Sequence, residues 1–160
     1  MVGVNVKVFV TYAAVLYLKF LATIAVQSRK TFCAGGRPPE DNKLHMAKRF
    51  PGVKQNYGTS ATDAPPSDQL LLVRHVELRW RRIVSNDLES IPLALFVFAG
   101  GILAESNDQV HSVAMVVYTF ARVAHTFAYA KSIQPQRSML WFAGVLSTIV
   151  GVANAVVAIL

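Results

Sequence analysis

The stretch "LRWRRIVSNDLESIPLALFVFAGGIL", Leu78–Leu103, joins a charged half directly to an apolar half, with no helix-breaking residue before Pro92. The apolar part, Ile91–Ala104, is too short to cross a bilayer alone, because a helical crossing needs about 20 residues. It spans only if the helix begins earlier, near Val76, and carries its charged residues into the membrane. The stretch therefore predicts a membrane-spanning helix with charged side chains at one end.

The composition agrees with a membrane protein. Of 160 residues, 53% are hydrophobic and 16% are charged, whereas about a quarter of a soluble domain is charged. The net charge of +7 does not indicate nucleic acid binding, because the basic residues gather between apolar segments and form no stripe with interleaved aromatic residues. His45, His75 and the single cysteine, Cys33, lack metal-ligand spacing, so we expect no metal site.

Three further segments are apolar over a membrane-spanning length. Val8–Val26 is interrupted only by Lys19, Val110–Ala130 carries Arg122 and two histidines, and Met139–Leu160 contains no charge. We therefore expect one all-α domain, residues 1–160, that forms an integral membrane four-helix bundle. The expected helices cover about 5–28, 75–104, 109–131 and 138–160.

The links between these helices predict their orientation. Residues 28–74 hold eight Lys/Arg and four Asp/Glu, Glu105–Gln109 has acids as its only charges, and Lys131–Arg137 is basic. Because basic links stay in the cytosol, we expect the first and third links there and both termini on the other side. The long cytosolic loop, 29–74, is either a passive linker or part of a cover over a site.

Two of the predicted helices carry a polar stripe. On the second, spacings of three, four and three place four side chains on one face: Arg79, Arg82, Asn86 and Glu89. Arg81 and Asp87 are expected to point elsewhere. On the third, spacings of seven, four, three and four align five side chains: His111, Tyr118, Arg122, His125 and Tyr129.

Ionisable groups inside a membrane need a partner or a wet cavity. One interpretation is structural, with Glu89 neutralising Arg122 or Arg82 in a helix interface. The other is functional, because the many cationic and hydroxyl donors around one carboxylate favour an anionic ligand that also carries an amine. Lys19 is interpreted as a side chain that extends its ammonium to the membrane interface.

Four motifs make the sequence similar to the MAPEG family, the membrane-associated proteins of eicosanoid and glutathione metabolism. "NDLESIP" (Asn86–Pro92) and "ARVAHTFAY" (Ala121–Tyr129) resemble motifs of its second and third helices. "PPED" (Pro38–Asp41) resembles its cytosolic-loop motif, and "QPQRS" (Gln134–Ser138) the start of its fourth helix. The resemblance implies a homotrimer in the endoplasmic reticulum or a similar membrane, such as the mitochondrial outer membrane. Glutathione would bind between neighbouring subunits near the cytosolic side.

The resemblance also implies a set of site residues. Glutathione would be held by seven side chains: Arg82, Asn86, Glu89, Arg122, His125, Tyr129 and Arg137. Glu89 would bind the glutathione amino group. Arg137 would stabilise the thiolate, with Ser138 as a hydrogen-bond donor to the sulfur and Asp41 as the partner of Arg137. At Val26 the sequence lacks an arginine often found in the family, and Arg29 follows one turn later.

The expected chemistry is attack of the glutathione thiolate on a lipophilic electrophile or a lipid hydroperoxide that arrives through the membrane lipid. "NDLE" and "QP" resemble microsomal glutathione transferase, whereas "RVAHT" and "RS" resemble microsomal prostaglandin E synthase. We predict a membrane-bound glutathione transferase with glutathione as co-substrate. The alternatives are a prostaglandin-E-synthase-like isomerase and a non-catalytic membrane scaffold of the same family.

Overall fold

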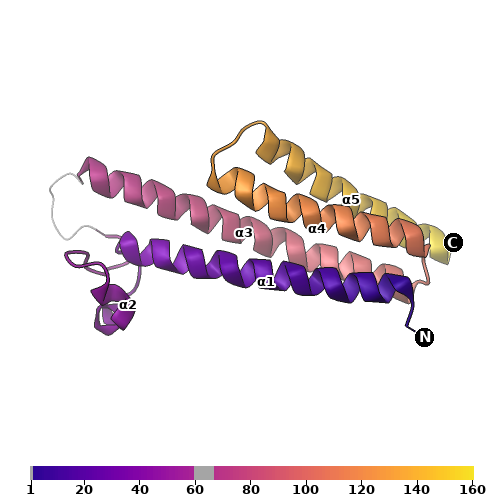
Figure 1. The fold of residues 1–160 in the computed structure, drawn as a ribbon, viewed down its shortest axis with the longest axis horizontal. Coiled ribbons are helices and arrows are strands. Elements are labelled where there is room, and N and C mark those ends of the chain that lie inside the picture. The colour runs from indigo at the N-terminus through magenta and orange to yellow at the C-terminus, as the bar shows by residue number, and fades with distance from the viewer. Residues whose placement is uncertain (1, 60–66) are drawn as a thin grey trace. The chain divides into compact units, whose positions relative to one another are not determined.

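A computed structural model describes residues 2–59 and 67–160, and within these ranges the regular structure is helical throughout (Figure 1). In chain order the elements are α1 (Val4–Cys33), the 3-10 helix η1 (Pro39–Lys43), α2 (His45–Lys48), α3 (Asp68–Leu103), α4 (Asp108–Ala130) and α5 (Gln136–Ile159). The expected all-α class is confirmed.

The helices α1, α3, α4 and α5 are each long and apolar enough to cross a membrane. The ends of α4 and α5 lie within two residues of the predicted bounds. By contrast, α1 continues to Cys33, and α3 begins at Asp68, seven residues before the predicted start. The prediction followed the apolar spans; the added residues of α1 begin with Arg29 and Lys30, whereas the added turns of α3 carry Leu70–Val73 between polar residues.

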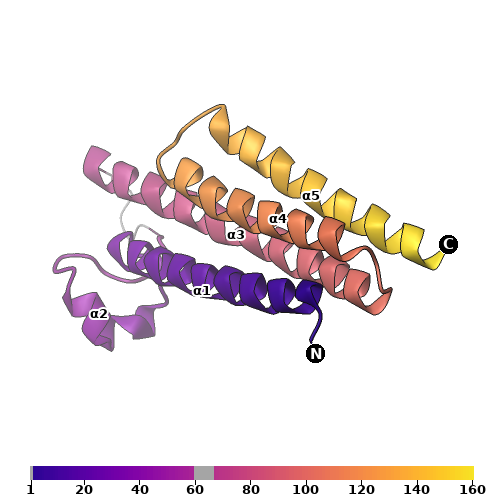
Figure 2. The ribbon, with the colours of Figure 1, turned by 45° about the vertical axis from the view of Figure 1, so that its right-hand side comes forward.

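The chain forms two compact units, which we call the bundle unit and the loop unit. The bundle unit contains the chain up to Leu21 together with Ser85–Leu160, and the loop unit contains Ala22–Val84. The core of the bundle unit joins α1, α3 and α4 through seven buried side chains: Leu16, Ile91, Ala94, Phe98, Ala114, Met115 and Tyr118. Helix α5 packs along α4 (Figure 2).

Small residues of α5 let its neighbours come close. A Cβ atom on Gly144 would lie 3.6 Å from Cδ of Arg122, and one on Gly151 would lie 3.1 Å from the ring of Phe98. Many side chains that face outward from the bundle unit are apolar. Phe96, for example, is 77% exposed and Phe120 is 73% exposed. Such surfaces are stable in lipid, which agrees with membrane-length helices.

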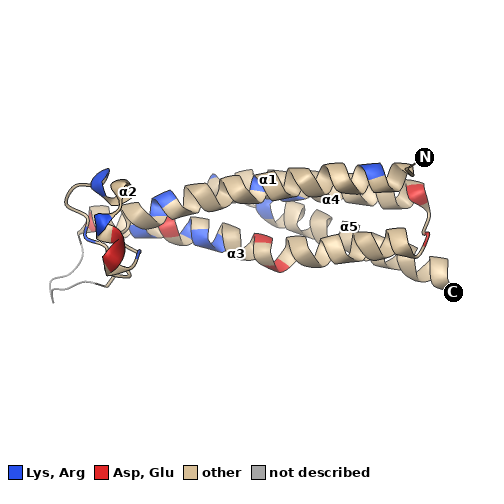
Figure 3. Cartoon of the chain, turned by 90° about the horizontal axis from the view of Figure 1, so that it is seen from below, with Lys and Arg blue, Asp and Glu red and all other residues tan. Residues whose placement is uncertain are grey.

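The loop unit carries most of the charge. Eleven of the 16 Lys/Arg lie in Ala22–Val84, and Figure 3 shows basic and acidic residues along this part of the chain. Within the loop unit, Gln55 is fully buried, at 0% exposure. The amide of Gln55 donates to the Phe32 carbonyl and accepts from the Arg37 backbone N–H. The segment after α1 is therefore folded against the end of that helix.

Candidate functional site

Five of the predicted site residues line one hollow of the bundle unit, with a volume of about 250 Å³. They come from three helices, α3, α4 and α5. The lining residues are Asn86, His125, Tyr129, Arg137, Ser138, Trp141 and Phe142. The structure therefore brings together predicted residues as far apart in the sequence as Asn86 and Ser138, which are 52 positions apart.

Arg137 lies in the first turn of α5, which begins just after Pro135. Its guanidinium carbon is 4.5 Å from the centroid of the Tyr129 ring, within the range of a cation–π interaction. With its oxygen turned toward Arg137, the Gln134 amide accepts from the guanidinium and donates to Oγ of Ser138 at 3.3 Å. A ring and an amide thus hold the guanidinium at this hollow.

His125 and Tyr129 occupy successive turns of α4 and pack edge to face, with ring centroids 5.7 Å apart. His125 is buried at 3% exposure, whereas Tyr129 is half-buried. The buried imidazole supports the phenol ring, and the ring in turn supports Arg137. This stacking gives the wall of the hollow a defined geometry.

Asn86 supplies an unused hydrogen-bond acceptor. Its Oδ1 atom is buried and has no hydrogen-bond partner among the described residues. A buried acceptor without a donor costs about 1–3 kcal/mol, so a ligand N–H or ammonium group at this point would be favoured. Asn86 therefore offers a buried side-chain oxygen that can accept a hydrogen bond from a donor group of a ligand.

A second hollow, of about 310 Å³, lies between α3 and α5 and shares Asn86 and Trp141 with the first. Glu89 lines this second hollow, where its exposed carboxylate accepts a hydrogen bond of 3.0 Å from Oγ of Ser85. The rest of its lining is mostly apolar: Ser90, Leu93, Ala94, Val145, Thr148, Ile149 and Val152. Glu89 thus lines a hollow that adjoins the hollow around Arg137.

Sequence reasoning missed a buried charge cluster formed by Lys19, Asp87 and Arg122. The Asp87 carboxylate is 1% exposed and accepts from Lys19 Nζ at 2.5 Å and from Arg122 Nη2 at 2.7 Å. Asp87 points away from the exposed Glu89 of the polar stripe, as expected, and it faces the bundle core, where its partners were not predicted. Lys19 pairs with Asp87 instead of extending alone to the interface. A signal was present, since Lys19 and Arg122 are the lone cations of their apolar segments and need an acid.

Arg122 is therefore neutralised by Asp87 rather than by Glu89. Its Nη2 also donates to the Asn86 carbonyl at 3.1 Å, while its Nε atom has no hydrogen-bond partner in the described ranges. This contact connects the buried charge cluster to the backbone of Asn86. A direct contact of Arg122 with glutathione stays a prediction.

The other two predicted residues belong to the loop unit. The Asp41 carboxylate accepts a 2.8 Å hydrogen bond from Nε of Arg37, and Arg82 is exposed. Their roles toward Arg137 and glutathione stay predictions. Across residues 2–59 and 67–160, His, Cys, Asp and Glu form no group that could hold a metal ion.

The first two residues of the predicted α4 stripe have structural contacts. His111 is 1% exposed and packs edge to face on Phe98, with centroids 5.6 Å apart. The Tyr118 hydroxyl is 2.9 Å from Oγ of Ser90. The stripe therefore divides, with these two in the core and His125 and Tyr129 at the hollow.

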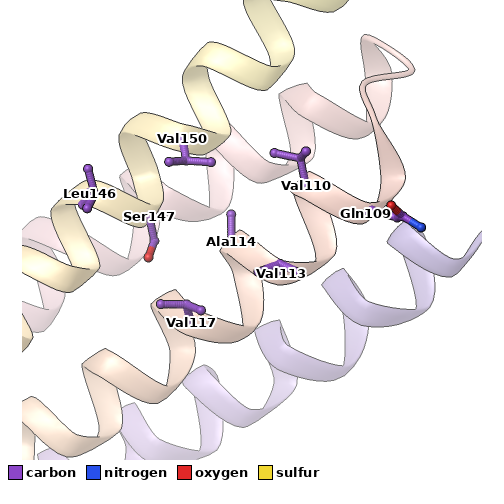
Figure 4. A pocket seen from close by; sticks show the side chains of 8 residues that line it. All are labelled: Gln109, Val110, Val113, Ala114, Val117, Leu146, Ser147 and Val150. Carbon is purple, nitrogen blue, oxygen red and sulfur yellow. The ribbon is translucent and has the colours of Figure 1, made fainter.

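A third hollow, of about 440 Å³, lies between α4 and α5 (Figure 4). Its lining is apolar except for Gln109 and Ser147, and Oγ of Ser147 donates to the Ala143 carbonyl at 2.8 Å. No acid, base or cation lines it. The hollow around Arg137 is therefore the better candidate for chemistry.

Four membrane-length helices and a hollow lined by an arginine, a histidine and a tyrosine define an α-helical membrane protein with a polar site. The sequence model of the MAPEG family matches residues 8–157, so the chain belongs to the MAPEG family. A comparison with curated protein sequences finds no significant match. The family consists of membrane helical bundles with glutathione-related transferase and isomerase functions, and it also has non-catalytic members. The resemblance drawn from the four motifs is confirmed.

Proposed function

We propose that the protein is a membrane-bound glutathione transferase that activates the glutathione thiolate beside Arg137. The observation that carries this proposal is the single hollow lined by Arg137, Ser138, His125, Tyr129 and Asn86. A thiol is mostly protonated at neutral pH, and a neighbouring guanidinium favours the thiolate. Ser138 donates a hydrogen bond to the same sulfur.

The residues of the hollow fit the chemistry of glutathione. The tripeptide carries two carboxylates, one ammonium group, two peptide N–H groups and a thiol. The unused Oδ1 of Asn86 accepts from a ligand N–H, and Glu89 in the adjoining hollow accepts from the ammonium group. Arg122 and His125 complete the proposed binding set in the bundle unit, and the family resemblance adds Arg82 as a further glutathione contact and Asp41 as the partner of Arg137.

The reaction follows from this arrangement. The thiol loses its proton to water, and the thiolate sulfur forms a bond to an electrophilic carbon while that carbon releases its leaving group. The electrophile is lipophilic, since the adjoining hollow is lined mainly by aliphatic side chains of membrane-length helices. A lipid hydroperoxide is the other proposed substrate class: the thiolate attacks the terminal peroxide oxygen, the O–O bond breaks, and the lipid leaves as an alkoxide that takes a proton to become the alcohol. A second glutathione then reduces the resulting sulfenic acid, which gives glutathione disulfide and water.

A second candidate is a glutathione-dependent isomerase similar to prostaglandin E synthase. Ser138 favours it, because this hydroxyl lines the hollow next to Arg137. In that reaction the thiolate would attack an endoperoxide oxygen, the O–O bond would break, and the other oxygen would take a proton to become a hydroxyl. A base, such as water, would then remove the proton from the carbon that bears the sulfur-bound oxygen, so that the carbonyl forms and the S–O bond breaks to release the thiolate.

One panel of assays separates these functions. The full chain is purified in detergent and incubated with glutathione and an aryl halide, a lipid hydroperoxide or a prostaglandin endoperoxide. Conjugation of the aryl halide supports a transferase, and turnover of the endoperoxide alone supports the isomerase. Binding of glutathione without turnover of any substrate would favour a scaffold.

We also propose a homotrimer in the endoplasmic reticulum membrane, with glutathione held between neighbouring subunits. The exposure of Glu89 and Arg82 supports this, because a neighbouring subunit can cover side chains that one chain leaves open. Native mass spectrometry in detergent measures the assembly. A stable and active monomer would rule out the shared site.

A further inference from the structure

The segment Lys43–Lys54, which we call the basic loop, is uniformly basic. It contains Lys43, Lys48, Arg49 and Lys54 and no Asp or Glu, and all four side chains are exposed. Four cations within 12 residues match the density of juxtamembrane segments that bind anionic lipids.

The basic loop is closed at its neck by a reciprocal pair of hydrogen bonds. The Asn42 side chain accepts from the Gln55 backbone N–H at 2.9 Å and donates to the Gln55 carbonyl at 3.0 Å. The buried Gln55 amide then donates to the Phe32 carbonyl, in the last turn of α1, at 2.9 Å. Both ends of the loop are thus fixed to α1, so its cations are displayed together.

Apolar side chains lie among the cations. Leu44 is 47% exposed and Met46 is 37% exposed, whereas Ala47 between the lysines is buried. Cations combined with exposed aliphatic side chains are typical of segments that lie in the headgroup region of a bilayer. The same loop therefore offers both charge and anchoring groups.

The position of the basic loop in the chain indicates which partner it can reach. It lies between α1 and α3, which are both long enough to cross a membrane, so the loop is tethered close to a bilayer surface. Such tethering gives a high effective concentration of headgroups. A lipid surface is favoured over a soluble acidic partner for this reason.

We propose that the basic loop docks on the anionic phospholipid headgroups of the membrane that the chain itself spans. The proposal is independent of the transferase chemistry, because the basic loop contains no residue that lines the hollow around Arg137. Docking would hold the end of α1 and the segment after it against the membrane surface.

The test uses the full chain with an environment-sensitive bimane label at position 45, introduced by His45→Cys in a Cys33→Ser background. The protein is reconstituted in nanodiscs of phosphatidylcholine alone or with phosphatidylserine. Quenching by acrylamide, which is neutral, measures how accessible the label at position 45 is to solvent. Phosphatidylserine should reduce quenching severalfold, and about 1 M salt should restore it, because the screening length is then about 3 Å.

Two charge variants locate the effect. Lys48→Gln with Arg49→Gln should lower the ratio of docked to free loop by roughly 25-fold, since each cation near an anionic surface contributes a factor of about five. The matched control is Lys7→Gln with Lys131→Gln, which removes two exposed cations of the bundle unit and should keep the protection. Circular dichroism checks that each variant stays helical, and Lys43→Gln with Lys54→Gln replaces the first pair if it unfolds.

Equal quenching with and without phosphatidylserine would overturn the proposal. Equal loss of protection in both charge variants would also overturn it, because the effect would then follow net charge and not the loop. Protection that appears only when an acidic polypeptide is added would assign the loop to a protein partner instead.

Discussion

Replacing Asp87 by asparagine should destabilise the bundle unit strongly. The carboxylate is 1% exposed and lies 2.5 Å from Lys19 Nζ and 2.7 Å from Arg122 Nη2. Asparagine keeps the size but removes the negative charge, so it leaves the cationic groups of α1 and α4 facing each other in the core. The perturbation therefore acts on electrostatics and leaves packing almost unchanged.

The magnitude follows from the burial of all three side chains. Removing one partner of a buried ion pair typically costs about 3–5 kcal/mol, because the remaining charge stays desolvated without compensation. Asp87 has two cationic partners, so the upper part of this range is expected. Removing one of the cations as well should recover part of the loss, so Lys19→Met combined with Asp87→Asn should be more stable than Asp87→Asn alone.

Thermal and denaturant unfolding of the purified full chain, followed by circular dichroism, measures these differences. Ser85→Ala is the matched control, because the Ser85 hydroxyl donates to the exposed Glu89 carboxylate and not to the buried cluster. A change below about 1 kcal/mol for Asp87→Asn would place it in the range of exposed pairs. That result would refute the conclusion that the cluster of Lys19, Asp87 and Arg122 is buried and charged.

Three further substitutions test separate parts of the structure. Glu89→Gln should weaken glutathione binding by about 1.5–3 kcal/mol, the value of a charge-assisted hydrogen bond, while the unfolding temperature stays unchanged; calorimetry showing unchanged affinity with a large loss of stability would favour a structural role. Asn107→Ala should cost about 1 kcal/mol of unfolding free energy, because the side chain caps α4 by accepting from the backbone N–H groups of the next residues; an unchanged melting curve would contradict this. Gly151→Val should cost about 1–3 kcal/mol through overpacking, since its Cβ would lie 3.1 Å from the Phe98 ring; a variant as stable as the parent would show that α5 adjusts freely.

The fold followed from the sequence because membrane helices are encoded by local composition. Apolar runs of sufficient length predicted the four membrane-length helices. Composition could not predict how far helices continue beyond their membrane-spanning apolar segments, as α1 and α3 do. It also could not predict the Asn42–Gln55 pair, because that contact depends on the three-dimensional path of the chain.

The candidate site was predicted in part. Helical spacing and the family motifs identified residues that line a common hollow, including Asn86, His125 and Arg137. Spacing on one helix correctly separated Asp87 from the stripe but could not predict its partners, because spacing reports which side chains share a face and not which face meets a neighbouring helix. The position of Lys19 on another helix decided that question.

The most direct test of thiolate stabilisation by Arg137 is the ultraviolet absorbance of glutathione bound to Arg137→Ala, measured near neutral pH with turnover recorded in the same preparation. Turnover should fall by roughly 10–1,000-fold, since one electrostatic donor of this kind contributes a few kcal/mol, and the thiolate absorbance should fall with it. Glutathione affinity should change less, because other contacts hold the tripeptide, and Arg137→Lys should retain part of the signal. Intact turnover with an intact thiolate signal would contradict the role of Arg137 and would make Tyr129 or Ser138 the first candidate.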